Sequence, residues 1–303
     1  AAPYDLTFGP DPSTHEYCTF GGMIGNNSCG VHSQQAGRTE DNVVSLEILT
    51  YDGVRMHVGE TNAHALEQRK TETGRPGAIY RKLDHLRQEY ASEIRNRYPD
   101  IPRRVSGYSL PALLPENGFH VAKSLVGSEG TCVTVLEATI ELVYRPPHRS
   151  LVVVGYENIF RAGDHVAEIS MFDPIGLEGI DEILLENIRR AGLDPGGLDL
   201  LPEGGLLFVE FGGDTREEAN ARGRQLVDWV ERKSPAATGV VLMTDPAEQA
   251  RMWGVRESAL GATAHVDDQP DTWPGWEDSG VPPEVIGDYM LELRGLYDKY
   301  EYN

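Results

Sequence analysis

The stretch Thr19-Phe-Gly-Gly-Met-Ile-Gly-Asn-Asn-Ser-Cys-Gly30 carries the most specific information about the fold of this 303-residue chain. Its four glycines permit positive φ angles and the close approach of a bound group. The Asn-Asn-Ser run at 26–28 adds amide and hydroxyl groups, and successive N–H groups in such a loop can cradle anionic oxygen atoms. The spacing differs from the G-x-G-x-x-G dinucleotide fingerprint. By itself the stretch predicts either an anion-binding loop or a purely structural turn.

A second glycine-rich segment, Leu125-Val-Gly-Ser-Glu-Gly-Thr131, leads into a predicted strand at 132–144. Gly127 and Gly130 again allow close approach, and Ser128 and Glu129 place polar groups at the tip of the turn. Because glycine turns that enter strands are common, this segment favours a binding role no more than a structural one.

The chain around these segments predicts one α+β unit. Residues 1–40 are rich in Gly, Pro, Asn, Ser and Thr and predict a long loop without helical periodicity. Residues 43–50 and 55–58 predict a hairpin through the turn at 51–53, and residues 62–98 predict helix interrupted at Pro76 and ended by Pro99.

Residues 62–104 predict a basic helical insertion in this unit. Residues 69–104 carry 10 basic and 5 acidic side chains, a balance of +5. The excess of positive charge indicates either a solvated helical face or a surface for a phosphate or an acidic partner, and a solvated face is the commoner case.

The second part of the chain alternates strands with helices. Strands are predicted at 151–155, 175–180, 206–211 and 240–243, with capped helices beginning at Asp214 and Asp245 and a last helix after Pro282-Pro283. Pro146-Pro147 marks a boundary, so we expect domains at 1–147 and 148–303. The alternation predicts an α+β sandwich with helices on one face of the sheet.

Charge and cysteine usage exclude several classes of protein. The net charge of -21 argues against a nucleic-acid partner, because phosphate contacts need clustered Lys and Arg. No apolar run is long enough for a membrane span, and no signal peptide opens the sequence. The 3 cysteines form no C-x-x-C pair, which argues against a disulfide framework, a zinc site or an iron–sulfur cluster in this segment. We expect a cytoplasmic location, with peripheral membrane attachment left open.

Taken together, the motifs resemble the FAD-binding domain of the vanillyl-alcohol oxidase superfamily, the PCMH type. The family's P-D-P-S, T-x-G-G-x-x-x-x-N-x-x-G, G-x-T-x-D and G-S-E-G-T motifs correspond to residues 10–13, 19–30, 37–41 and 127–131. The chain is most similar to the branch of D-lactate, glycolate and D-2-hydroxyglutarate dehydrogenases, in particular to large bacterial members with an iron–sulfur module. The likeness continues through 174–181, Trp253-Gly-Val-Arg-Glu257 and 272–278. It implies the second half of a PCMH-type domain followed by a ferredoxin-like α+β substrate (cap) domain.

The resemblance also implies site residues. Arg256, in the W-x-x-R-E motif, would reach towards the substrate carboxylate, a task that suits the fork of guanidinium donors. A surface arginine held in a salt bridge is the alternative interpretation. The residues that would line FAD are Pro10, Asp11, Ser13, Thr19, Gly21, Gly22, Gly25, Asn26 and Gly30 from the first segments, with Glu129 and Val135 from the second.

The implied function is an FAD-dependent dehydrogenase that oxidises a D-2-hydroxy acid, with D-2-hydroxyglutarate favoured, to the 2-oxo acid by hydride transfer to flavin N5. The electron acceptor would be a quinone, an electron-transfer protein or a linked iron–sulfur module. The alternative substrates are D-lactate, glycolate or another alcohol such as a sugar. A truncated scaffold that holds no FAD, and an acidic protein–protein adaptor, are the non-enzymatic alternatives.

Parts of the family pattern are not found between Ala1 and Asn303. The N-terminal flavin half is expected before Ala1, and the H-x-G-D-G-x-x-H stretch with the catalytic histidine and metal ligands is expected beyond Asn303. We therefore expect this fragment alone to be inactive and to hold no metal; a divalent metal and an iron–sulfur cluster would belong to other parts of the parent protein. Leu260 and Trp276 replace a hydroxyl and a lysine of the human-type 2-hydroxyglutarate branch, which leaves the substrate open.

Overall fold

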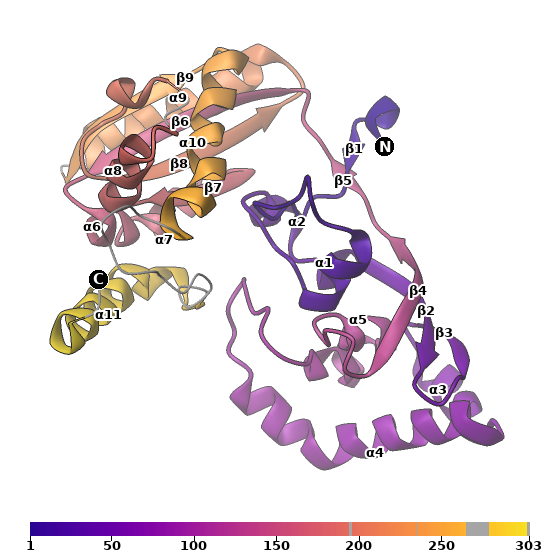
Figure 1. Ribbon diagram of the computed structural model, residues 1–303. Coiled ribbons are helices and arrows are strands. Elements are labelled where there is room, and N and C mark those ends of the chain that lie inside the picture. Colours follow the sequence, from indigo (N-terminus) through magenta and orange to yellow (C-terminus); the bar gives the residue numbers. More distant parts are fainter. Residues whose placement is uncertain (194–195, 235, 265–278, 302–303) are drawn as a thin grey trace. The chain divides into compact units, whose positions relative to one another are not determined.

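A computed structural model of the chain describes residues 1–193, 196–234, 236–264 and 279–301. It consists of two compact units, Ala1–Val143 and Tyr144–Asn303, drawn from indigo to magenta and from pink to yellow in Figure 1. The boundary predicted from the sequence lies after Pro147. Each unit has its own hydrophobic core.

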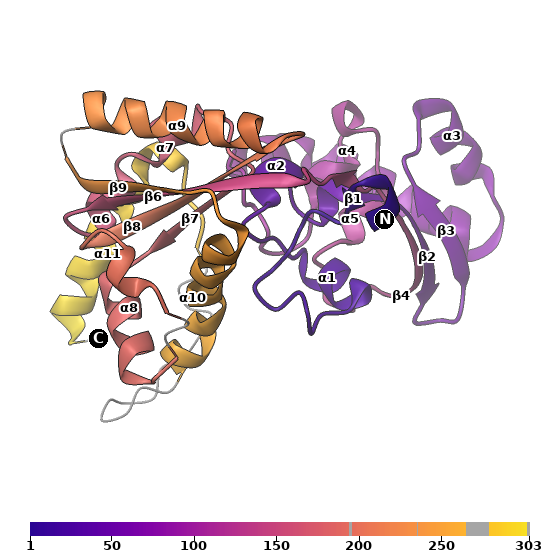
Figure 2. The same ribbon diagram turned by 90° about the horizontal axis from the view of Figure 1, so that it is seen from above.

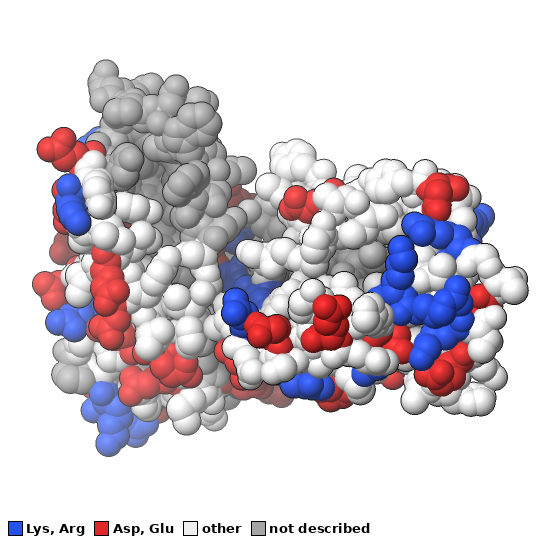
Figure 3. Space-filling model, turned by 90° about the horizontal axis from the view of Figure 1, so that it is seen from below, with Lys and Arg blue, Asp and Glu red and all other residues white. Residues whose placement is uncertain are grey.

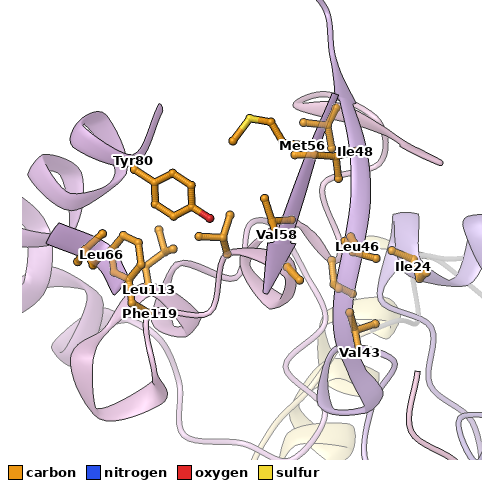
Figure 4. Close-up of a cluster of buried hydrophobic side chains, with 14 residues drawn as sticks. Ile24, Val43, Leu46, Ile48, Met56, Val58, Leu66, Tyr80, Leu113 and Phe119 are labelled. Atoms are coloured by element: carbon orange, nitrogen blue, oxygen red, sulfur yellow. The ribbon is translucent and has the colours of Figure 1, made fainter. Parts of the chain in front are cut away.

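The first unit is built on a three-stranded antiparallel sheet of order β3-β2-β4, formed by β2 (Val43–Thr50), β3 (Arg55–Gly59) and β4 (Val133–Ile140). The hairpin predicted at 43–58 is confirmed, with Leu46 opposite Val58. From Leu46 onward alternate residues of β2 are buried, and Figure 4 shows Ile24 of α1 beside Leu46 in the core. A short strand, β1 (Leu6–Thr7), pairs with β5 (Val143–Tyr144) at the unit boundary.

Helices surround this sheet. They are α1 (Phe20–Asn26), α2 (Ser33–Ala36), α3 (Ala63–Thr71), α4 (Gly74–Arg97) and α5 (Val121–Leu125), with 3-10 turns at Ala2–Tyr4, Glu40–Asn42, Leu110–Leu113 and Pro115–Asn117. The expectation of a loop without helix over 1–40 was wrong, because α1 forms despite its glycines. The Thr19 side chain accepts the N–H of Gly22, and burial of Met23 and Ile24 offsets the low helix propensity of glycine.

The second unit contains a four-stranded antiparallel sheet of order β7-β8-β6-β9. Its strands are β6 (His148–Tyr156), β7 (Gly176–Ile180), β8 (Gly205–Gly213) and β9 (Ala237–Met243). Helices α6 (Ile159–Gly163) and α7 (Val166–Ser170) connect β6 to β7, and α9 (Arg216–Lys233) connects β8 to β9. This order and these crossovers are those of a ferredoxin-like βαββαβ fold, which confirms the predicted fold class.

Helices cover both faces of this sheet, so the expectation of helices on one face was wrong. One core cluster joins the sheet to α8 (Glu182–Arg190) and α10 (Pro246–Ala264), and another joins it to α6, α7 and α9. Figure 2 shows α9 on one side of the sheet and α8 and α10 on the other. The run Leu151–Val154 is buried at every position, as in a strand that faces two apolar layers.

The ends of the helices follow local capping rules. Thr215, rather than Asp214 as expected, caps α9 by accepting the N–H of Glu218, so the N-cap lies one residue later than predicted. Asp245 caps α10 as predicted, accepting the N–H groups of Ala247 and Glu248. The second unit also contains 3-10 turns at Leu198–Leu200 and Pro283–Val285 and a last helix, α11 (Ile286–Tyr300). No helix within the described ranges has the length and apolar character to cross a membrane.

Candidate flavin and substrate sites

The two glycine-rich segments of the first unit meet in the structure. The N–H of Gly127 donates to the carbonyl of Ile24 at 2.9 Å, and the N–H of Glu129 donates to the carbonyl of Gly25 at 2.8 Å. Glu129 takes a positive φ of 49° to make this turn. Segments about a hundred residues apart in the sequence therefore form one loop structure, here called the glycine cradle (residues 19–30 and 127–131).

Two glycines of the cradle keep an open surface. A Cβ atom on Gly21 would meet only the Thr19 Oγ1 atom at 4.0 Å, and one on Gly25 would meet only the Glu129 Cα atom at 4.0 Å. Gly21 is exposed at the start of α1, where backbone N–H groups lack partners within the helix. Bare backbone and N–H donors without side chains suit the phosphate-bearing chain of FAD, so these residues fit the predicted cofactor.

Gly30 has a different, structural reason to be glycine. A Cβ atom there would lie 1.8 Å from the Asp11 carbonyl oxygen, so the loop 10–13 and the end of the cradle interlock. The Asp11 carboxylate accepts the His32 backbone N–H at 3.1 Å and contacts His32 Nδ1 at 2.5 Å. Pro10 is buried and Ser13 is exposed on this loop.

The remaining predicted flavin residues have mixed surroundings. Asn26 is exposed, and its Oδ1 accepts the hydroxyl of Ser28 at 2.6 Å. Val135 lies on β4 opposite Ile48 and packs against the core of the first unit. Gly22 donates its N–H to Thr19. Assignment of these residues to the cofactor stays a prediction.

A buried polar network, not predicted from the sequence, supports the cradle from behind. Glu40, 5% exposed, donates its backbone N–H to Asn27 Oδ1 at 2.9 Å, and its carboxylate accepts the Asn27 amide at 3.3 Å and the Ser109 hydroxyl at 2.5 Å. Asn27 has a left-handed φ of 58° at the end of α1. The network fixes the turn at which the chain leaves α1. Its only sequence signal was the acidic residue Glu40 within the motif Gly37–Asp41.

Next to this network, Arg38 and Asp41 form an ion pair at 3.1 Å. Burial tends to raise the pKa of Asp41, but hydrogen bonds from Arg38 outweigh it and hold that pKa below its ordinary value.

His120 caps α5 by accepting the N–H of Lys123. Burial lowers the pKa of His120, which favours the neutral imidazole that can accept this hydrogen bond.

The loop that follows the basic helices also touches the cradle. Arg103 places its guanidinium 3.1 Å from the sulfur of Cys29, and the Tyr108 hydroxyl lies 2.8 Å from the hydroxyl of Thr131.

The helices α3 and α4 themselves carry charges that are largely paired within the unit. The pairs are Lys70 and Arg87 with Asp84, Arg95 with Glu116, and Arg97 with Glu93. Figure 3 shows blue side chains gathered at the right of the view, with red side chains along the edges of this patch. The pairing favours the interpretation as a solvated helical face.

In the second unit, the W-x-x-R motif lies on α10 above the sheet. The Nε of Arg256 donates to Glu178 Oε1 of β7 at 3.1 Å, and these side chains are only 17% and 20% exposed. One helical turn earlier, Trp253 stacks edge-on against Phe208 at 5.8 Å and donates its indole N–H to Glu210 at 2.9 Å. Arg256 is thus salt-bridged, as in the alternative interpretation, but on the sheet side of its helix.

Glu210 is the most buried carboxylate of this face. It is 1% exposed and also binds the Arg149 guanidinium at 2.9 Å. Neither Glu178 nor Glu210 was predicted as a site residue; their only sequence signal is a charged residue inside a strand whose neighbouring residues are apolar.

Within the described ranges no group of three or more His, Cys, Asp or Glu side chains could hold a metal ion. The predicted segment 272–278, including Trp276, lies outside the described residues, and the side chain of Leu260 is not described.

Comparison with known families identifies the class of protein. The family "FAD linked oxidases, C-terminal domain" matches residues 145–303, and the family "FAD binding domain" matches residues 1–59. The chain therefore belongs to the FAD-linked oxidase family. The matches confirm the predicted family and FAD as its cofactor.

The more similar relatives are dehydrogenases and oxidases of hydroxy acids. The chain is 29% identical to a D-2-hydroxyglutarate dehydrogenase of Pseudomonas putida over 98% of its own length and 30% of the relative's. It is 24% identical to the glycolate oxidase subunit GlcD of Escherichia coli, over 99% of the chain and 48% of the subunit. A solved alkyldihydroxyacetonephosphate synthase matches 87% of the chain and 40% of that structure at 15% identity, with a TM-score of 0.47. The chain spans about 30% of the length of the D-2-hydroxyglutarate dehydrogenases that it matches.

Proposed function

We propose that the protein containing this chain is an FAD-dependent dehydrogenase that oxidises a D-2-hydroxy acid, with D-2-hydroxyglutarate as the favoured substrate, to the 2-oxo acid. The observation that carries the proposal is the meeting of the two glycine-rich segments through the backbone bonds from Gly127 to Ile24 and from Glu129 to Gly25. Two separate flavin motifs forming one structure support a shared ligand better than two unrelated turns would.

In this proposal the chain's residues bind and orient. The cradle holds the phosphate-bearing part of FAD with its open backbone at Gly21 and Gly25 and with the backbone N–H of Gly21. The Arg256 guanidinium pairs with the substrate carboxylate, which fixes the position of C2 and its hydroxyl group. When bound, FAD supplies the acceptor for the hydride that leaves C2. The hydroxyl proton passes to a base that we assign to a part of the protein outside this chain.

The choice of D-2-hydroxyglutarate is supported by the name of the Pseudomonas putida relative. Glycolate and D-lactate are the alternatives, and the GlcD relative supports glycolate. We further propose that the reduced flavin passes its electrons to a quinone, an electron-transfer protein or a linked iron–sulfur module, and that a divalent metal or such a cluster is held elsewhere in the protein. The free cysteines Cys18, Cys29 and Cys132 support a reducing, cytoplasmic location.

The test is anaerobic reduction of the FAD-loaded full-length protein by a panel of acids. D-2-hydroxyglutarate, D-lactate and glycolate are added separately, with L-2-hydroxyglutarate as the stereochemical control, while the flavin absorption is followed. We expect one D-acid or glycolate to bleach the flavin far faster than L-2-hydroxyglutarate. A flavin that every member of the panel leaves oxidised would contradict the proposed reaction class.

A further inference from the structure

We infer that Glu178 is a positioning residue for substrate binding, which holds Arg256 by its Nε so that the terminal nitrogens of the guanidinium can pair with the substrate carboxylate. The inference rests on the proposed function and assigns a role to a residue outside the family motif. It starts from the fact that the contact between the two side chains runs through Nε alone, at 3.1 Å.

The chemistry of arginine gives this single contact its meaning. A guanidinium offers five N–H donors in a planar fork, and its two terminal nitrogens together match the two oxygens of a carboxylate. A carboxylate at Nε restrains the plane of the fork and leaves that end for another anion. Among the residues that the structure describes, Glu178 is the one partner of the Arg256 side chain.

The surroundings make the restraint effective. Trp253, three residues before Arg256, lies on the same side of α10 and is anchored by Phe208 and Glu210. Glu178 lies directly opposite Phe208 in the pairing of β7 with β8. Helix α10 is therefore anchored to β8, the strand that pairs with β7, and β7 carries Glu178. The Arg256 and Glu178 side chains are both mostly buried. A long side chain that is tethered in this way loses less conformational freedom when it binds a ligand.

Two substitutions separate the hydrogen bond from the charge. Glu178→Gln keeps an oxygen that can accept the Nε–H, whereas Glu178→Ala removes the acceptor. In the FAD-loaded full-length protein we expect Glu178→Ala to raise KM for the D-2-hydroxy acid by about tenfold or more, with flavin reduction at saturating substrate within about threefold of wild type. Glu178→Gln should recover most of the lost affinity. The matched control is Glu186→Ala, which breaks an exposed pair with Arg190 on α8 and should leave KM unchanged.

A double-mutant cycle with Arg256→Ala decides whether Glu178 acts through Arg256. We expect Glu178→Ala to change KM by less than about twofold in the Arg256→Ala background, because the group that it positions is already gone. An unchanged KM in Glu178→Ala, or an equal effect of that substitution with and without Arg256, would overturn the inference. If wild-type protein is reduced by no acid of the panel, the proposed function fails first and the inference falls with it; if only the cycle fails, the proposed function stands.

Discussion

The glycine cradle of the first unit and the W-x-x-R face of the second unit build their candidate sites in opposite ways. The cradle presents mainly backbone: Gly21 and Gly25 with open space, N–H groups and two main-chain hydrogen bonds that join distant segments, supported from behind by the side chains of Asn27 and Glu40. The W-x-x-R face is made of side chains, with the carboxylates Glu178 and Glu210 holding Arg256, Trp253 and Arg149. A backbone site is sensitive to added atoms, whereas a side-chain site is sensitive to removed ones.

The largest effect is expected from removing a carboxylate of the W-x-x-R face. Glu210→Ala should lower the free energy of unfolding of the second unit by about 3–5 kcal/mol, because it takes away the buried anion that Arg149 and Trp253 both contact. Urea unfolding followed by tryptophan fluorescence measures this. The exposed Glu217→Ala on α9 serves as the control and should stay within about 0.5 kcal/mol of wild type. A similar small loss for Glu210→Ala would mean that the network contributes little.

The next effect concerns binding rather than stability. In the full-length enzyme, Arg256→Ala should weaken apparent substrate binding by about 2–4 kcal/mol, because a charge-assisted pair with the substrate carboxylate is lost. Steady-state kinetics with the reactive acid of the panel measure KM and kcat. Arg251→Ala, an exposed arginine on the same helix, is the control. Wild-type kinetics in Arg256→Ala would remove Arg256 from the substrate site.

In the cradle, the addition of a single methyl group should lower the stability of the first unit. Gly30→Ala should destabilise the first unit by about 1–3 kcal/mol, because the new Cβ would overlap the Asp11 carbonyl oxygen. Thermal unfolding compares this variant with Gly21→Ala, whose Cβ has open space and should leave stability nearly unchanged. Equal stabilities for the two variants would show that the loop 10–13 does not interlock with the cradle as described.

A smaller effect is expected from the ion pair beside the cradle, and it depends on pH. The pKa of Asp41 is lowered in the folded protein, so its contribution to stability is present above its unfolded pKa of about 3.9 and is lost as pH falls through the folded value. Asp41→Asn should therefore be less stable than wild type at pH 7 by up to about 1 kcal/mol, and the difference should shrink below pH 4. Unfolding curves at pH 7, 5 and 3 test the sign; a gap that widens in acid would contradict it.

The smallest effect should come from deleting an exposed side chain of the cradle. Asn26→Ala should change the free energy of unfolding by less than about 0.5 kcal/mol, since the Asn26 side chain bonds only to Ser28 within the described chain. A loss of FAD retention without a loss of stability would then assign the amide to the cofactor. A loss of stability would show that the cradle depends on side chains after all and would weaken the comparison.

Both segments of the cradle could be singled out from the sequence because their motifs consist largely of glycines, and the structure brings them together; their assignment to FAD stays a prediction. Gly21 and Gly25 leave space by having no side chain, and this property can be recognised without knowing the fold. The hairpin at 43–58 and the capped helix at Asp245 were likewise predicted from local signals. The helix α1 was missed because burial of Met23 and Ile24, a tertiary effect, overrides the poor helix propensity of glycine.

The W-x-x-R face shows what local signals cannot predict. Arg256 could be singled out from its motif, but its partner Glu178 lies 78 residues earlier and meets it only through the packing of α10 on the sheet. The same is true of Glu210, whose role depends on its position in β8 beside β6 and β7. The burial of both sheet faces, from which these contacts follow, was underestimated although the Leu151–Val154 run is apolar at every position.

The most direct test of the account is FAD retention by Gly21→Val in the full-length protein, measured from the ratio of flavin to protein absorbance after gel filtration. Gly295→Val, at an open position of α11, is the matched control. The account predicts that Gly21→Val folds like wild type but loses most of its FAD, while Gly295→Val stays fully yellow. A Gly21→Val protein that retains wild-type FAD would contradict the assignment of the glycine cradle to the cofactor.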